Sequence, residues 1–328
     1  MTIMTVMTMG AVFTDTATTL GAVLTDTATA TTTTTTTMDV VMHLLGLLLT
    51  PAAVRAFYLA ASALVLVIQA TPALRNRFLA YGSRATTAKP AQVCPPKGLE
   101  RLLDYAATFQ VPHSYFTHFY VASVASSVFW AWKLRLWDAG GQLPALWALM
   151  LLQGVRRLVE SYAYTSSSTS SMWIAHWILG LLFYMVTNVA VWVDLQSDLG
   201  LHRESYPAAL SWKTAIFAPA VLTVQGIQHV YHAYLYRLRT QNDGYQLPSH
   251  PLFPNLLCPH YTCDIAVYVL LSFLGAPTGC PVNWTLATAA LFTAVNLGVT
   301  AAGTKDWYEQ RFGKDKTSAR RRMLPWLW

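Results

Sequence analysis

The sequence predicts an all-α integral membrane protein, with about seven transmembrane helices enclosing a cofactor and substrate cavity open to the cytosol. The 328-residue chain is 54% hydrophobic and only 11% charged, whereas soluble domains carry about 25% charged residues. Its apolar residues form runs of roughly 20, the length that crosses a bilayer. Its net charge of +7 comes from basic residues between those runs, a pattern typical of membrane topology and not of nucleic-acid binding.

The first 37 residues differ in composition from the rest of the chain. They are rich in threonine and contain an imperfect repeat, GAVFTDTAT followed by GAVLTDTAT. The segment has no basic n-region, so it is a poor signal peptide. We expect residues 1–37 to be a disordered, dispensable extension, and residues 38–328 to form the membrane domain.

Seven apolar runs are long enough to be membrane spans. The run VVMHLLGLLL is too short to cross alone and is expected to lead into the first span. The predicted spans lie near 53–73, 117–137, 143–163, 172–194, 208–234, 261–280 and 284–303.

Basic residues are distributed unevenly between the two sides that seven spans define. The loops after spans one, three and five share a side with the C-terminal tail, and most Lys and Arg residues lie there. The positive-inside rule therefore predicts a cytosolic C-terminus. Cys94, Cys258 and Cys263 fall near that side, which implies no disulfide framework. The sequon at Asn283 lies on the other side, too close to the membrane for its use to be expected.

Polar residues gather towards the cytosolic ends of the spans. In LLQGVRRLVESYAY, Arg156 and Glu160 are four residues apart, while Arg157 points about 100° away on a helix. One interpretation is an ion pair that closes the helix end. The other is that one arginine pairs internally while its neighbour faces an anion.

A polar stripe also marks the end of the fifth predicted span, VQGIQHVYHAYLYRLR. Gln225, Gln228 and His232 recur at helical spacing, and Gln228 and His232 share a face. Arg239 follows further along the helix. A stripe that leads to an arginine favours a functional site over a single structural histidine.

The stretch CPHYTCDIAVY opens the sixth span, where ionisable groups are costly and therefore indicate function. His260 and Asp264 are four residues apart and can face one cavity. Cys258 and Cys263 do not complete a metal site, which needs at least three ligands in suitable geometry. We expect a polar pocket with no metal, and Tyr308, just past the last span, can reach it.

These groups together indicate a phosphorylated soluble ligand, since guanidinium pairs well with phosphate. The surrounding lipid suits an apolar second ligand. No G-x-G-x-x-G motif follows a strand, so a dinucleotide would bind without a Rossmann domain. The residues alone predict a polytopic membrane enzyme that uses a soluble anionic cosubstrate.

At these positions the chain resembles the steroid 5α-reductase family, and most closely its polyprenal reductase branch. The motifs run in order from about residue 75 to the last residue: RNRFLAYGSR, VPHSYFTHFYVAS, LLQGVRRLVES, HAYLYRLR, CPHYTCD, WYEQRF and RRRMLPWLW. The resemblance implies a multi-pass enzyme of the endoplasmic reticulum membrane that uses NADPH. The implied reaction is reduction of polyprenal to dolichal, for the dolichol carrier of protein N-glycosylation, with no obligate protein partner.

The resemblance also implies a set of site residues. Arg157 and Arg239 would bind phosphates, while Gln228, His260 and Asp264 would orient the nicotinamide or adenosine part and Tyr308 would close the site. The whole expected cofactor set is Arg157, Gln228, His232, Arg239, Tyr245, His260, Asp264 and Tyr308. Gln228 departs from the Asn that steroid reductases show.

The group that polarises the substrate carbonyl is less well defined by the resemblance. The Gln-Glu pair that steroid reductases carry early in the chain is missing here. His118 and Tyr120 in VPHSYFTHFY are the candidates. They are two residues apart and are not expected to share a helix face, so one of them is expected to act. The alternative is that both are interfacial aromatic residues.

Other functions are also compatible with the sequence. A steroid 5α-reductase or an enoyl-CoA reductase would act on a different enone. A membrane methyltransferase for prenylated cysteine has a related cytosolic end and would bind S-adenosylmethionine instead of NADPH. A seven-span receptor is disfavoured because it does not require arginines and acids around a closed cavity.

Overall fold

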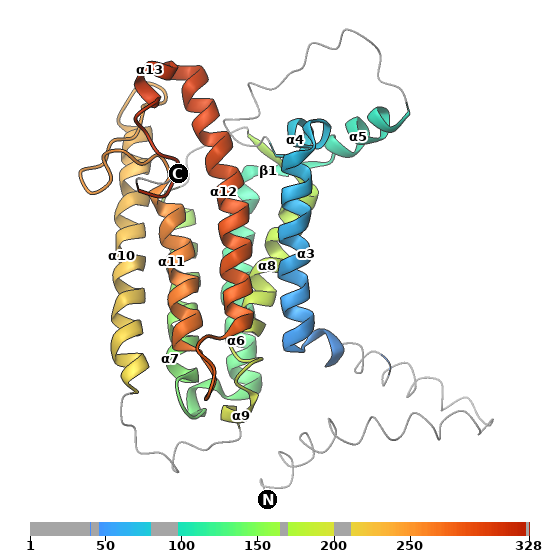
Figure 1. The fold of residues 1–328 in the computed structure, drawn as a ribbon, viewed down its shortest axis with the longest axis vertical. Coiled ribbons are helices and arrows are strands. Elements are labelled where there is room, and N and C mark those ends of the chain that lie inside the picture. The colour runs from blue at the N-terminus through green and yellow to red at the C-terminus, as the bar shows by residue number, and fades with distance from the viewer. Residues whose placement is uncertain (1–39, 41–45, 80–97, 165–169, 200–210, 326–327) are drawn as a thin grey trace, which may run out of the picture. The chain divides into compact units, whose positions relative to one another are not determined.

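The computed structural model describes residues 40, 46–79, 98–164, 170–199, 211–325 and 328. The Thr-rich extension expected at 1–37, and Cys94 in the first loop, lie outside the described residues. The chain divides into two units, Met1–Leu48 and Leu49–Trp328. The described part of the second unit, which holds every candidate site residue, is built mainly from helices (Figure 1).

Helices occur at all seven ranges predicted as spans. They are α3 (Pro51–Ala70), α6 (Phe116–Leu134), α7 (Leu143–Ala163), α8 (Ile174–Ala190), α10 (Trp212–Thr240), α11 (Pro259–Leu274) and α12 (Trp284–Phe312). Among the described residues, α3 and α12 are long and apolar enough to cross a membrane. For the other five, a membrane crossing stays a prediction. Because α12 continues to Phe312, Tyr308 lies on the helix and not beyond it.

Short elements connect these helices. The two strands pair in antiparallel register, with Val111 opposite Met172, and this small sheet is absent from the all-α prediction. The short elements are α4 (Pro72–Phe78), α5 (Leu99–Ala107), β1 (Gln110–Pro112), η3 (His113–Tyr115), η4 (Leu136–Asp138), β2 (Ser171–Trp173), α9 (Gln196–Leu199) and α13 (Lys314–Thr317).

Small residues allow α6 to pack closely against its neighbours. A Cβ atom on Gly154 of α7 would lie 3.0 Å from the Ser123 hydroxyl of α6, and one on Gly180 of α8 would lie 2.5 Å from the Phe119 ring. A larger side chain at either position would push the helices apart. These contacts hold α7 and α8 close against α6.

Asn283 begins α12 and is completely buried. Its side-chain oxygen accepts a hydrogen bond from the Leu286 amide (2.9 Å), as at a typical helix N-cap. Its amide group donates to the Gly275 carbonyl (3.1 Å). Asn283 is therefore a structural cap that joins α11 to α12.

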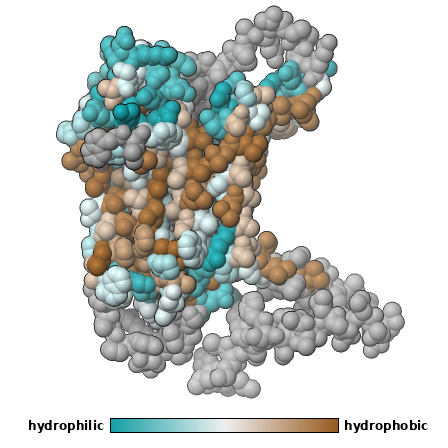
Figure 2. All heavy atoms as spheres, viewed as in Figure 1, coloured by the Kyte–Doolittle hydropathy of each residue, from teal (hydrophilic) through white to brown (hydrophobic). Residues whose placement is uncertain are grey.

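Figure 2 shows hydrophobic residues across the middle of the molecule and hydrophilic residues gathered at the end that carries α13. Among the described residues, 33 large hydrophobic side chains are exposed, and those on α3 include Leu59, Leu64 and Val67. Exposed apolar surface of this extent indicates contact with lipid or another apolar partner.

Candidate active site

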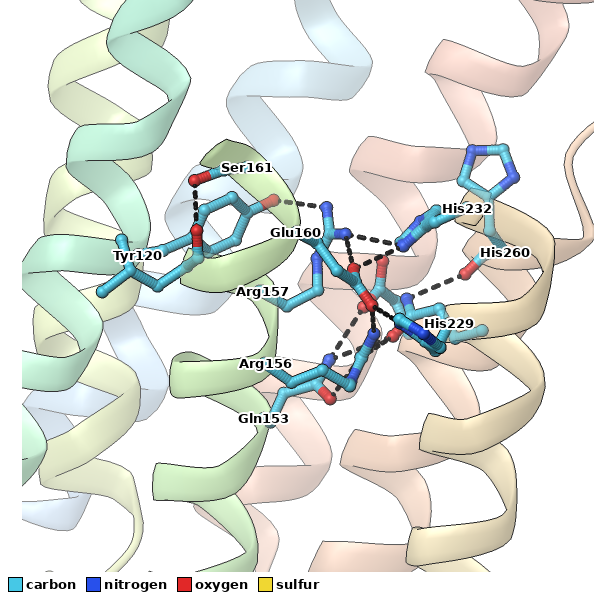
Figure 3. A network of polar contacts seen from close by, with 12 residues as sticks. Tyr120, Gln153, Arg156, Arg157, Glu160, Ser161, His229, His232 and His260 are labelled. Carbon is cyan, nitrogen blue, oxygen red and sulfur yellow. Dashed lines mark hydrogen bonds and ion pairs between the residues drawn. The ribbon is translucent and has the colours of Figure 1, made fainter. Parts of the chain in front are cut away.

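The last two turns of α7 carry a buried carboxylate, Glu160, whose side chain is 3% exposed. It pairs with the guanidinium groups of Arg156 and Arg157 on its own helix. Across the helix interface, His229 Nδ1 lies 2.8 Å from Oε1 and His232 Nδ1 lies 2.8 Å from Oε2. A buried charge is costly unless it is paired and hydrogen-bonded, so four partners keep Glu160 stable inside the bundle (Figure 3).

Arg157 extends this group towards α6. Its Nη2 donates to the hydroxyl of Tyr120 at 2.6 Å, and its Cζ lies 4.8 Å from the centre of the Tyr120 ring. Since Tyr120 is 3% exposed, this contact brings a charged donor to a buried phenol. The tyrosine oxygen accepts from Arg157, which leaves its own proton free to donate to a further acceptor.

His232 lies between the two charges. Its Nδ1 is 2.6 Å from Arg157 Nη1 and 2.8 Å from Glu160 Oε2. In one neutral tautomer Nδ1 accepts from Arg157; in the other it donates to Glu160. The tautomer of His232 therefore decides which of these two contacts is a hydrogen bond.

Two glutamines join the network to α10 and α11. Gln228, which is completely buried, accepts from Arg156 and Gln153 and donates to the His260 carbonyl at 3.2 Å. Gln153 also donates to Asp264 Oδ1 at 3.3 Å. The Gln228 amide is thus occupied by protein partners, and it positions the start of α11.

The backbone carbonyl of His260 accepts a hydrogen bond from Gln228, while its ring packs against aromatic side chains. The ring stacks on Tyr231, with centres 5.5 Å apart, and meets His232 edge to face at 5.4 Å. Within the described part of the chain, its buried Nδ1 has no hydrogen-bond partner. Figure 3 shows the carbonyl facing the network and the ring turned away from it. A buried polar atom without a partner requires an explanation. A bound ligand that hydrogen-bonds to this nitrogen would provide one.

The network is balanced in charge. It contains two arginines, Arg156 and Arg157, and two acids, Glu160 and Asp264, and the four are linked through Gln153 and Gln228. Both arginines bind Glu160, so the ion pair that closes the helix end includes Arg157 as well as Arg156, and the hypothesis that one of them also faces a ligand anion stays a prediction. On a helix, positions three apart are also neighbours, which is why Arg157 reaches this carboxylate.

Other predicted residues lie in a second cluster. The Arg239 guanidinium is 4.3 Å from the centre of the Tyr245 ring, and Arg311 lies over the same ring at 5.2 Å. Trp307 meets Tyr245 edge to face at 4.8 Å, and Tyr308 contacts the Trp307 ring at 5.0 Å. This cation–aromatic cluster joins the C-terminal ends of α10 and α12.

The structure separates the two candidate carbonyl donors. Tyr120 is buried in the network, whereas His118 is exposed and packs with Tyr115 (ring centres 4.5 Å apart) and Trp177 (6.1 Å). Their spacing of two residues puts them on different sides of α6. Tyr120 is therefore the one of the two that meets the buried polar groups.

Sequence reasoning did not select His229 and treated Glu160 only as an ion-pair partner. His229 lies four residues after Gln225, so the helical spacing that marked the polar stripe also contained it. Its side chain is 49% exposed, while Glu160 is buried. A buried acid on α7 needs partners on another helix, and this requirement was the signal for His229.

The chain is similar to known reductases over most of its length. The family model for 3-oxo-5-alpha-steroid 4-dehydrogenase matches residues 170–328, which include His232, His260 and Tyr308 but not α6 or α7. The chain is 26% identical to the polyprenal reductase of Saccharomyces cerevisiae over 227 residues, covering 69% of this chain and 78% of the relative. It is 23% identical to polyprenal reductase 2 of Oryza sativa subsp. indica, covering 77% and 89%.

A shorter match involves a steroid enzyme. The chain is 31% identical to the steroid 5-alpha-reductase DET2 of Solanum lycopersicum over 93 residues, which is 28% of this chain and 33% of that protein. The polyprenal reductases therefore match over a much larger share of the chain.

Proposed function

Since this chain is a relative of the steroid 5α-reductases, on the polyprenal reductase branch of that family, we propose that it reduces the α,β double bond of polyprenal to give dolichal. The product leads to the dolichol carrier of protein N-glycosylation. The observation that carries the site assignment is the buried hydroxyl of Tyr120 held by Arg157, in turn held by Glu160. The protein is an oxidoreductase acting on a CH–CH group.

Bound NADPH would supply the hydride that adds to the β-carbon of the enal. The Tyr120 hydroxyl, whose oxygen accepts from Arg157, has its proton available for the substrate carbonyl oxygen. Negative charge develops on that oxygen as the hydride adds, and a fixed donor stabilises it. Arg157 strengthens this donor because its positive charge lies beside the phenol oxygen. A proton from water completes the α-carbon.

The residues around His260 fit a nicotinamide. A carboxamide offers both a donor and an acceptor, and the unpaired His260 Nδ1 and the Asp264 carboxylate can serve these groups. We propose Gln228 as a positioning residue, because it holds the His260 backbone and has its amide occupied. His232 orients Arg157.

We assign the phosphates to Arg239, which is exposed and lies beside Tyr245, with Tyr308 closing the site from α12. Arg157, expected from the resemblance to bind phosphate, is already engaged by Glu160 and Tyr120. Its contacts favour the orientation of Tyr120 instead. We further propose that the bundle crosses the endoplasmic reticulum membrane seven times with a cytosolic C-terminus, as the loop charges favour.

The first experiment is turnover by the purified full-length chain in detergent with polyprenal and NADPH. We expect loss of NADPH absorbance and a product two hydrogens heavier. His260→Ala and Asp264→Asn should abolish turnover, whereas Tyr162→Phe, at an exposed tyrosine on α7, should leave it unchanged.

The same assay separates the alternatives. Turnover of a steroid enone or an enoyl-CoA without turnover of polyprenal would support the proposed reductase activity but contradict the proposed substrate. Binding of S-adenosylmethionine without NADPH binding would overturn the reductase and favour the methyltransferase.

A further inference from the structure

Helix α5 is amphipathic, and its apolar face has no protein cover within the described residues. Leu99, Leu102, Tyr105 and Phe109 lie on one side of the helix and just beyond its end, at 69%, 62%, 63% and 47% exposure. Glu100, Arg101 and Asp104 occupy the other side. A helix with this division of residues lies at a boundary between water and an apolar phase.

Contacts with the rest of the bundle fix the position of α5. Asp104, on its polar side, accepts from Arg77 Nε of α4 at 2.6 Å. The Trp173 indole donates to the Ala106 carbonyl at 2.9 Å, and the Ile174 amide donates to the Phe109 carbonyl at 2.9 Å. Because the polar side and the C-terminal end are tied to α4, β2 and α8, the apolar face is directed away from these partners.

The apolar face of α5 lies at the level expected for the surface of the membrane. Helix α3 is long and apolar enough to cross a bilayer, and Leu64 and Val67 on it are exposed. It ends at Ala70, and α4 begins at Pro72, after a single intervening residue. Figure 1 shows α4 and α5 beside this end of α3. A bilayer that covers the outward face of α3 therefore reaches its headgroup zone at the level of α5.

We propose that α5 is an interfacial membrane helix, which inserts Leu99, Leu102, Tyr105 and Phe109 into the lipid leaflet at the C-terminal end of α3. The occupant of this face is the boundary between lipid headgroups and acyl chains, where an amphipathic helix buries its apolar side to a depth of about 5–10 Å. The proposal depends on the position of α5 beside a spanning helix and is independent of the substrate.

The test uses spin labels on the full-length protein in nanodiscs of phosphatidylcholine and phosphatidylserine. Cys94 and Cys280 are replaced by serine; Cys258 and Cys263 are buried. A nitroxide is placed at Leu102→Cys or, as a matched control on the polar side of the same helix, at Glu100→Cys. Leu64→Cys on α3 is the lipid reference. Collision with oxygen, which concentrates in lipid, is compared with collision with a water-soluble nickel chelate.

We expect the oxygen-to-nickel ratio at position 102 to approach that at position 64 and to exceed that at position 100 several-fold. Equal ratios at 100 and 102, with nickel dominant, would place both sides of α5 in water and overturn the proposal. An immobile label at 102 that meets neither agent would show cover by protein, which also overturns it. NADPH-dependent turnover, measured separately, keeps this outcome distinct from failure of the proposed reaction.

Discussion

Asp194 and Glu160 are buried acids in two separate clusters of the described residues, and the two clusters are built differently. Near the start of α12, Asp194 pairs with Arg55 Nη2 at 2.8 Å and accepts from the Thr285 amide at 3.2 Å. Arg55 Nε also donates to the Thr285 hydroxyl at 2.9 Å. This is a closed set in which one acid meets one arginine, and it joins α3, α12 and the chain after α8.

The Glu160 carboxylate has more partners than are needed to neutralise its single negative charge. One carboxylate meets two arginines and two histidines, and the network leaves a free phenol proton on Tyr120 and an unpaired nitrogen on His260. In the Asp194 cluster, by contrast, each carboxylate oxygen has a partner, Oδ1 in Arg55 and Oδ2 in the Thr285 amide. Spare buried donors and acceptors indicate a place for a ligand.

The largest effect should follow the loss of the central charge in the network. Glu160→Gln leaves two buried arginines with one fewer acid, and breaking a buried ion pair costs about 3–5 kcal/mol. We expect a strong decrease in thermal stability in detergent and loss of turnover. The control is Glu309→Gln, at the partly exposed Lys305–Glu309 pair (3.8 Å), where a surface pair contributes about 0–1 kcal/mol. Equal effects at both positions would contradict the central role of Glu160.

The second effect concerns chemistry and not folding. Tyr120→Phe removes the proposed donor, and loss of a positioned acid lowers the rate by roughly 10²–10⁴-fold. We expect kcat to fall by this factor while NADPH affinity changes little, measured by steady-state kinetics and NADPH titration.

Tyr58→Phe is the matched control for Tyr120→Phe. Tyr58 is also a buried tyrosine, and its hydroxyl lies 2.9 Å from Thr187, away from the network. Tyr58→Phe should cost about 1 kcal/mol of stability for the lost hydrogen bond, and Tyr120→Phe roughly 1.5–3 kcal/mol because its partner is charged. Only Tyr120→Phe should lower kcat. Unchanged turnover in Tyr120→Phe would remove it from the mechanism and return attention to His118.

A smaller effect is expected in the Asp194 cluster, where substitutions should change stability and not catalysis. Arg55→Ala and Asp194→Asn, measured singly and together, should show a coupling of about 0.5–3 kcal/mol in unfolding free energy, as expected for residues in direct contact. Detergent unfolding of the four proteins gives this value. The KM for NADPH in Asp194→Asn should match the parent protein, and a raised KM would contradict a purely structural role.

These two clusters also show how much of the fold and of the site can be predicted from the sequence. Apolar runs predicted the positions of seven helices, because the length and periodicity of a helix are local properties. Helical spacing placed Gln228 and His232 on one face and paired Arg156 with Glu160. The pairing of Tyr120 with Arg157, however, joins α6 to α7 through close packing at Gly154, and no local pattern reports such a distance.

The Asp194 cluster was not anticipated at all, for the same physical reason. Arg55 and Asp194 are 139 residues apart in the chain, and each is a single charge at the end of an apolar run, where charges are common. The sequence contains no repeat or spacing that connects them. The amphipathic pattern of α5 was equally readable in LERLLDYAA, but its significance depends on the exposure of Leu99 and Leu102.

The smallest expected effect concerns Asn283, beside the Asp194 cluster. The sequence Asn283-Trp284-Thr285 is a glycosylation sequon, but Asn283 and Thr285 are both completely buried. The Asn283 side chain is occupied by Leu286 and Gly275, so a glycan would require the cap to open. We therefore expect endoglycosidase treatment to leave the electrophoretic mobility of the protein unchanged. Asn283→Ala should instead lower stability by about 1 kcal/mol through loss of the cap. A mobility shift on treatment that disappears in Asn283→Gln would show that the cap opens during synthesis, and that this end of α12 forms after the sequon has been read.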